Sequence, residues 1–185
     1  MGKVKYNIHD VHYAPITAVD SAGVITYGTP VALPGAVSIS LEPQDGDNEI
    51  FYADGTEYYV QSGVGGYEGD LEMAYITDAF RSAIYGETTD GNNNIWESTE
   101  DDAKKFALGF VIDGNDEPIY FWWLNCAATK PSVASSTNEE NKTIGTDTIT
   151  VTASPNKAGN IRVKTTATST TVATWFDAVI GVPTP

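Results

Sequence analysis

The chain of 185 residues carries 25 Asp and Glu against 10 Lys and Arg, which gives a net charge of −15. This excess of negative charge excludes the class of proteins that grip nucleic acid through clustered cations. The length fits one domain, 41% of the residues are hydrophobic, and no segment reaches the roughly 20 apolar residues of a membrane span.

The apolar residues of the first segment, residues 1–16, have no clear period. They are Tyr6, Ile8, Val11, Tyr13 and Ile16. We therefore predict an extended N-terminal arm that packs against another surface. The segment lacks the apolar stretch of a secretory signal, so no signal peptide is expected. The chain's only two histidines, His9 and His12, are too few for a metal site of fixed geometry.

Two later segments, residues 37–42 and 67–75, share a two-faced pattern in which apolar and polar residues alternate. A period of two predicts strands with one set of side chains against a core and the other on an open face. The open set is Ser38, Ser40, Glu42, Glu68, Asp70 and Glu72. Pro43 is expected to end the first strand. The sequence thus predicts a wet, negatively charged sheet face.

A hairpin and a helix are predicted around the second of these strands. Residues 50–60 form the hairpin, with Asp54-Gly55 in its turn. Residues 79–85 form a short helix, which Thr77 or Asp78 can cap and Gly86 can end. Its apolar stripe, suited to covering a sheet, consists of Ala79, Phe80, Ala83 and Ile84.

The region after the helix begins with a polar, acidic loop over residues 87–102, in which Trp96 is expected to hold part of the loop down. Residues 106–112 and 119–124 predict a second hairpin. The later strand has apolar residues on both of its faces, so either both faces are buried within the chain or one face contacts a partner chain. The single cysteine, Cys126, excludes an intrachain disulfide and is expected to be a small buried hydrophobe.

The last predicted strands lie at residues 148–153 and 161–164, joined by a turn at residues 155–159, and a Thr-rich tail follows. These elements predict a mainly β fold, a β-sandwich or barrel with one short flanking helix and extended N- and C-terminal arms. The β domain is expected over residues 17–166, between the arm (1–16) and the tail (167–185).

Enzyme chemistry is not expected. Paired carboxylates are frequent, but a glycosidase acid needs burial to raise its pKa, and these carboxylates lie on exposed faces and in polar loops. Two Asp- and Gly-rich stretches, residues 45–49 and 113–117, do not match a calcium-binding loop and are ordinary turn compositions. No nucleophilic triad or nucleotide-binding loop is present. No cofactor or metal is expected.

The order of several short motifs resembles the major tail proteins of long-tailed bacteriophages of Gram-positive hosts, the subunits of the tail tube. The motifs are FYADGTEYY (51–59), GDLEMA (69–74), FALGFV (106–111), YFWWL (120–124), and KT (142–143) with TDTITVTA (146–153). Their succession, from about residue 35 to residue 163, carries the resemblance more than any one motif does.

The resemblance implies a structural virion protein without catalysis, assembled in the host bacterial cytoplasm. Such subunits form hexameric rings that stack into a tube, in which strands of neighbouring subunits join into one barrel around the channel for DNA ejection. The implied partners are other copies of the chain, the tail terminator, tape-measure and distal tail proteins, and passing DNA that is not tightly bound; no membrane is implied.

With this resemblance, the acidic face is expected to line the channel. The expected inter-subunit contacts are Tyr6, Ile8, Val11, Tyr13, Tyr120, Trp122, Trp175 and Phe176. The main alternative is a carbohydrate-binding or adhesin β-sandwich that would use Trp96, Trp122 or Trp175 as stacking surfaces. A glycosidase is the third hypothesis.

Overall fold

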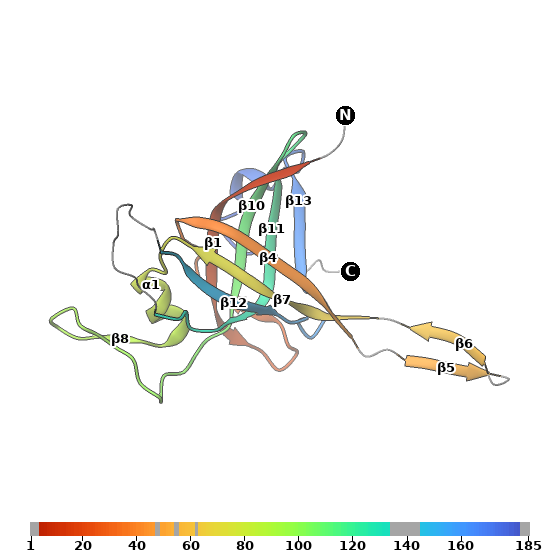
Figure 1. Ribbon diagram of the computed structural model, residues 1–185, viewed down its shortest axis with the longest axis horizontal. Coiled ribbons are helices and arrows are strands. Elements are labelled where there is room, and N and C mark those ends of the chain that lie inside the picture. Colours follow the sequence, from red (N-terminus) through yellow and green to blue (C-terminus); the bar gives the residue numbers. More distant parts are fainter. Residues whose placement is uncertain (1–3, 47–48, 54–55, 62, 134–144, 182–185) are drawn as a thin grey trace, which may run out of the picture.

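The computed structural model describes residues 4–46, 49–53, 56–61, 63–133 and 145–181. The fold is mainly β, as predicted. Within the described residues, nine strands form one antiparallel sheet in the order β2-β1-β10-β11-β12-β7-β4, with β3 beside β1 and β13 beside β11 (Figure 1). The strands of this sheet are β1 (Lys5–Val19), β2 (Ile25–Tyr27), β3 (Val31–Ala32), β4 (Ala36–Asp45), β7 (Val64–Met73), β10 (Phe106–Gly114), β11 (Ile119–Ala128), β12 (Asp147–Ala153) and β13 (Arg162–Thr166).

The predicted N-terminal arm is instead the long strand β1, which pairs with β10, β2 and β3. The apolar residues lack a period because the register with β10 shifts twice, between Tyr6 and Ile8 and between His9 and His12. Such bulges insert unpaired residues and break the alternation of faces. Asn7 and Asp10 adopt positive φ angles of 55° and 51° at these shifts. The centre of the segment therefore belongs to the β domain.

The two-faced segments form β4 and β7, which pair in register as neighbours, and β7 pairs in turn with β12. The prediction that Pro43 ends the first strand is wrong, because β4 continues to Asp45. Proline cannot donate a ladder hydrogen bond, but it is tolerated on an edge strand. Since β4 pairs only with β7 among the described residues, it is such an edge.

Strand β11 divides the sheet, because its two halves have different neighbours along one edge. Residues 119–123 pair with β13, and residues 126–128 pair with β12, while β10 pairs with the other edge of β11. The predicted turn at residues 155–159 does connect β12 to β13, with Gly159 N donating to the Asn156 carbonyl at 2.8 Å. Those two strands then pair with β11 rather than with each other.

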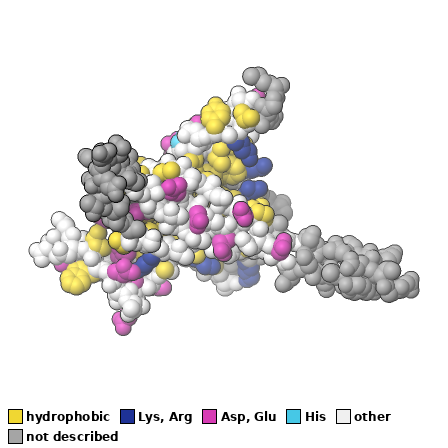
Figure 2. Space-filling model, viewed as in Figure 1, with side chains coloured by type: hydrophobic (Ala, Val, Ile, Leu, Met, Phe, Trp, Pro, Cys, Tyr) yellow, Lys and Arg dark blue, Asp and Glu magenta, His cyan; other side chains and the backbone are white. Residues whose placement is uncertain are grey.

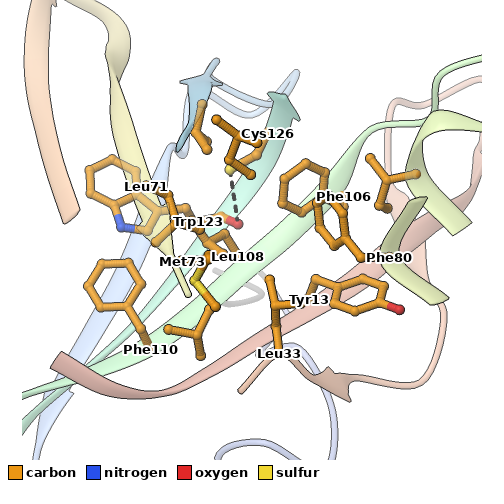
Figure 3. Close-up of a cluster of buried hydrophobic side chains, with 14 of the residues drawn as sticks. Tyr13, Leu33, Leu71, Met73, Phe80, Phe106, Leu108, Phe110, Trp123 and Cys126 are labelled. Atoms are coloured by element: carbon orange, nitrogen blue, oxygen red, sulfur yellow. Dashed lines mark hydrogen bonds between the residues drawn. The ribbon is translucent and has the colours of Figure 1, made fainter. Parts of the chain in front are cut away.

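The sheet folds over a main hydrophobic core. Figure 3 shows its side chains converging from β1, β7, β10 and β11, with Phe80 entering from the helix. Cys126 lies within it, fully buried, and its Sγ donates to the Trp123 carbonyl at 3.7 Å. The prediction of a small buried hydrophobe at this position is confirmed.

A second core lies on the opposite face of β10 and β11, under the C-terminal segment. Ala107, Trp122 and Leu124 are buried there against Trp175. The Trp122 Nε1 donates to the Trp175 carbonyl at 2.9 Å. Both faces of β11 are therefore buried within the chain itself. The predicted C-terminal arm is therefore not free: through residue 181, the segment that contains the 3-10 turn Val172–Thr174 packs against the sheet.

The predicted helix is present as one turn of α-helix, α1 (Asp78–Phe80), continued by a π-helix at Arg81–Tyr85. Thr77 caps it by accepting from Phe80 N at 3.3 Å, and Gly86 ends it with φ 78°. The wider π turn changes the buried stripe, which consists of Phe80, Ile84 and Tyr85. Ala79, expected in the stripe, is exposed.

Two small hairpins lie outside the main sheet. The predicted hairpin forms from β5 (Glu49–Ala53) and β6 (Thr56–Gln61) and extends away from the body of the molecule (Figure 1). Its Asp54-Gly55 turn lies outside the described residues. The acidic loop contains the second hairpin, β8 (Thr88–Thr89) with β9 (Ile95–Trp96).

Trp96 does not anchor this loop to the core: its side chain is 61% exposed and its Nε1 donates to Asp90 Oδ2 within the loop. Ion pairs tie the loop to the body: Lys130 Nζ lies 2.7 Å from Glu97 Oε1 and 3.9 Å from the buried Glu87 Oε1, and Arg81 Nη1 lies 3.7 Å from the same Glu87 oxygen.

Candidate functional site: an acidic sheet face

The candidate site is the open face of β4, β7 and β12. The register aligns side chains in three rows across these strands: Ser38, Glu72 and Thr148; Ser40, Asp70 and Thr150; Glu42, Glu68 and Thr152. All six residues predicted for the open face therefore lie on one surface. Five of them are exposed and Glu72 is half-buried. In Figure 2, separate acidic side chains stand over this part of the molecule among uncharged atoms.

The opposite faces of the same strands explain why this arrangement forms. Ile39, Leu71 and Ile149 lie in one row of the register, and all three pack in the main core. A slip of one residue would move this apolar row to solvent and the carboxylates into the core. Burial on the core side therefore sets the position of every acid on the open side.

Hydroxyl groups hold two of the carboxylates in place. Thr146 Oγ1 donates to Glu72 Oε1 at 2.7 Å, and Ser38 Oγ donates to Glu72 Oε2 at 2.9 Å. Thr150 Oγ1 donates to Asp70 Oδ1 at 2.9 Å. The bonds from Thr146 and then Ser38 lower the pKa of Glu72 below its usual value. Because a hydrogen bond to the charged form favours ionisation, this carboxylate stays negative at neutral pH.

The negative charge of the face is not neutralised locally. Glu42 lies directly opposite Glu68 on the neighbouring strand, and like charges in such a pair destabilise a sheet. Within the described part of the chain, no Lys or Arg forms an ion pair with the four carboxylates of the face. The carboxylates of the face therefore repel one another, and a cationic side chain at any of these positions would weaken that repulsion.

The acidic face lacks the buried carboxylate that a glycosidase acid needs. Glu42, Glu68 and Asp70 are exposed, and hydrogen bonds lower rather than raise the pKa of the half-buried Glu72. A groove of about 920 Å³ lies elsewhere, between the loop at residues 22–30, the turn at 156–158 and residues 177–181, and none of the six face residues lines it. No helix in the described residues is long and apolar enough to cross a membrane.

The residues predicted as inter-subunit contacts are divided by burial. Val11, Tyr13, Trp122 and Trp175 are buried in the subunit's own two cores, which corrects the expectation that they are available at its surface. They lie inside because β1 is a central strand and because the C-terminal segment covers β11.

The remaining four predicted contacts have some exposed surface. Tyr6 is exposed, while Ile8, Tyr120 and Phe176 are partly buried. Phe176 stacks on His12 with ring centroids 4.2 Å apart. For these four residues, contact with a second copy stays a prediction.

The sequence predicted the third strand of the face, at residues 148–153, but not its place beside β7. The alternation of Thr148, Thr150 and Thr152 with apolar residues indicates a two-faced strand. Its place beside β7, however, rests on a pairing between segments about 80 residues apart in the chain. The shared period of two suggests that β12 could pair with β7, but it does not distinguish β7 from the other two-faced strands. No known family model matches the chain, and no curated protein does.

Proposed function

We propose that the protein is the tail tube subunit of a long-tailed bacteriophage, which assembles as hexameric rings stacked into a tube. In this proposal the acidic face of β4, β7 and β12 lines the channel through which DNA leaves. The observation that carries the proposal is this face, on which the register aligns four carboxylates that form no ion pair with a Lys or Arg of the described residues.

Electrostatics supports the assignment. A channel lined by such faces sums the charge of many subunits and gives a negative wall along its length. DNA phosphates that approach this wall are repelled, so the polymer can pass without the cation contacts that create tight binding. The Ser and Thr hydroxyls between the carboxylates are polar but uncharged, so the wall stays hydrated between its charges.

The strand edges support assembly. Among the described residues, β4 and β13 each pair along one edge only. Unpaired edges promote association with other chains, and assembly into a closed structure removes them. The two edges differ in charge, because β4 carries Glu42 and Asp45 whereas β13 carries the exposed Arg162 and Lys164. A contact between unlike patches is heterologous and generates rings or filaments.

The carbohydrate-binding alternative loses two of its three stacking residues, because Trp122 and Trp175 are buried. No further observation favours it over the tube subunit.

The first test is electron microscopy of the purified protein, which should show rings or tubes. A particle that stays monomeric at high concentration would contradict the proposal.

The second test replaces Glu68, Asp70 and Glu72 by Lys. Tubes should still form, because these side chains lie on the open face, but the basic wall should retain DNA and impair its passage. The matched control replaces Glu100, Asp102 and Asp177, exposed residues outside the face, by Lys and so changes the net charge equally. DNA ejection that is impaired equally in both variants, or in neither, would refute the channel assignment.

A further inference from the structure

Within the described residues, one histidine, His9, bridges two carboxylates; it is half-buried and lies near the N-terminal end of β1, outside the proposed channel face. His9 Nδ1 lies 3.0 Å from Asp10 Oδ2, and His9 Nε2 lies 3.1 Å from Asp113 Oδ1 on β10. Both ring nitrogens of one histidine therefore face carboxylate oxygens, one on its own strand and one on the neighbouring strand.

This geometry requires a particular protonation state. An ionised carboxylate has only acceptors, and a neutral imidazole has one N–H, so it can satisfy only one of the two contacts. The imidazolium has an N–H on each nitrogen and satisfies both. Asn7 Nδ2 donates to the second oxygen of Asp113 at 2.8 Å, and the bonds from Asn7 and then His9 lower the pKa of Asp113. Asp113 thus remains an acceptor at neutral pH.

Besides the two carboxylates, the titratable side chain that lines the same pocket as His9 is His12, whose Nδ1 lies 2.8 Å from the Asp10 carbonyl. From β1 His9 faces Asp10, and from β10 it faces Asp113. The third side of its pocket is formed by residues 32–36, Ala-Leu-Pro-Gly-Ala, which carry no titratable side chain. Despite the desolvation that opposes it, the hydrogen bonds and charges of the two carboxylates raise the pKa of His9 above its usual value.

The bridge lies at an end of β1 that has few core contacts and is held mainly by hydrogen bonds to the end of β10. Residues 4–7 are exposed, and the two register shifts separate this end from the buried centre at Val11, Tyr13 and Ala14. Backbone pairing of residues 5–9 with residues 111–114 is therefore supported mainly by polar contacts, with Ile8 the one residue of this end that packs partly against the main core. Local opening of such a segment does not require unfolding of the domain.

We infer that His9 is a pH-sensitive latch, which in its doubly protonated form fastens the N-terminal end of β1 to the end of β10. Loss of one ring proton removes the donor from one of the two contacts and places a lone pair against a carboxylate. Because the pKa of His9 is raised in the latched form, the latch is fully effective below the pKa of a free histidine and is lost as the pH rises through the raised pKa. This inference does not depend on the proposed function.

Hydrogen exchange of the full-length protein tests the latch. We expect the protection of amides in residues 4–9, relative to those in 11–14, to fall about two- to fivefold as the pH rises through the pKa of His9, the range measured for exposed ion pairs. The rates are corrected for the intrinsic effect of pH. The pKa itself can be followed by exchange of the imidazole Cε1 hydrogen, which mass spectrometry detects in monomers and assemblies alike.

Three variants separate the latch from general destabilisation. His9→Gln should remove the pH step and leave residues 4–9 weakly protected throughout, and Asp113→Asn should lower the pKa of His9. His12→Gln should keep the step, because His12 Nδ1 contacts the Asp10 carbonyl at 2.8 Å and needs one proton only. Equal protection at all pH values, a step that survives in His9→Gln, or a pKa of His9 at or below the ordinary value would overturn the inference.

Discussion

The packing of the C-terminal segment over β11 gives the most quantitative prediction, because two tryptophans in opposite environments can receive the same substitution. Trp175 is 2% exposed and packs with Trp122 and Leu124 in the second core. Its Nε1 also donates to the Phe121 carbonyl at 3.4 Å. Trp96 is 61% exposed and donates one hydrogen bond to Asp90.

Trp175→Ala should therefore lower the free energy of unfolding by about 3–5 kcal/mol, the usual cost of truncating a buried aromatic residue. Trp96→Ala loses one exposed hydrogen bond and should cost about 1 kcal/mol or less. In a chain of this size, each 1 kcal/mol shifts the Tm by roughly 2–4 °C. The buried substitution should thus lower the Tm by roughly 6–20 °C and the exposed one by only a few degrees.

The measurement is urea and thermal unfolding followed by far-UV circular dichroism, which does not depend on the tryptophan signal. It should be made at a concentration where wild type and both variants are monomeric, since assembly adds its own stability. If Trp175→Ala were no more destabilising than Trp96→Ala, the C-terminal segment would not be part of the folded domain, and our account of the second core would be refuted.

Two further predictions concern the main sheet and its core. Gly69→Ala should destabilise the protein by about 1–3 kcal/mol, because the added Cβ would overlap the Ser40 carbonyl oxygen on β4. Gly91→Ala, where a Cβ meets open space, should change stability by less than about 0.5 kcal/mol; equal effects in chemical denaturation would argue against the β4–β7 register. The Cys126 thiol should be unreactive toward a disulfide reagent in the native protein and reactive in urea, since burial raises its pKa to about 12. Native-state reaction at the rate of a free thiol would show that this part of the core is open.

The elements whose signals are local could be predicted from the order of the residues. Alternation within residues 37–42 and 67–75 predicted which side chains share a face, because a strand turns successive side chains to opposite sides. The prediction fails at the ends, where Val37 and Tyr75, expected on the core side, are 48% and 54% exposed. The cap at Thr77 and the left-handed Gly86 bounded the helix for similarly local reasons. The acidic face could therefore be outlined before its surroundings were known.

How these elements meet depends on long-range contacts of the folded chain. Two bulges hid β1 from any periodic analysis, since each one reverses the faces of the residues beyond it. The Thr-bearing strand β12 joined the acidic face, and Trp175 covered Trp122, through contacts between residues far apart in the chain. Such contacts form because they bury the apolar surface of the whole chain. A local pattern cannot predict them, because many segments share the same alternation while only one arrangement of the strands buries both cores.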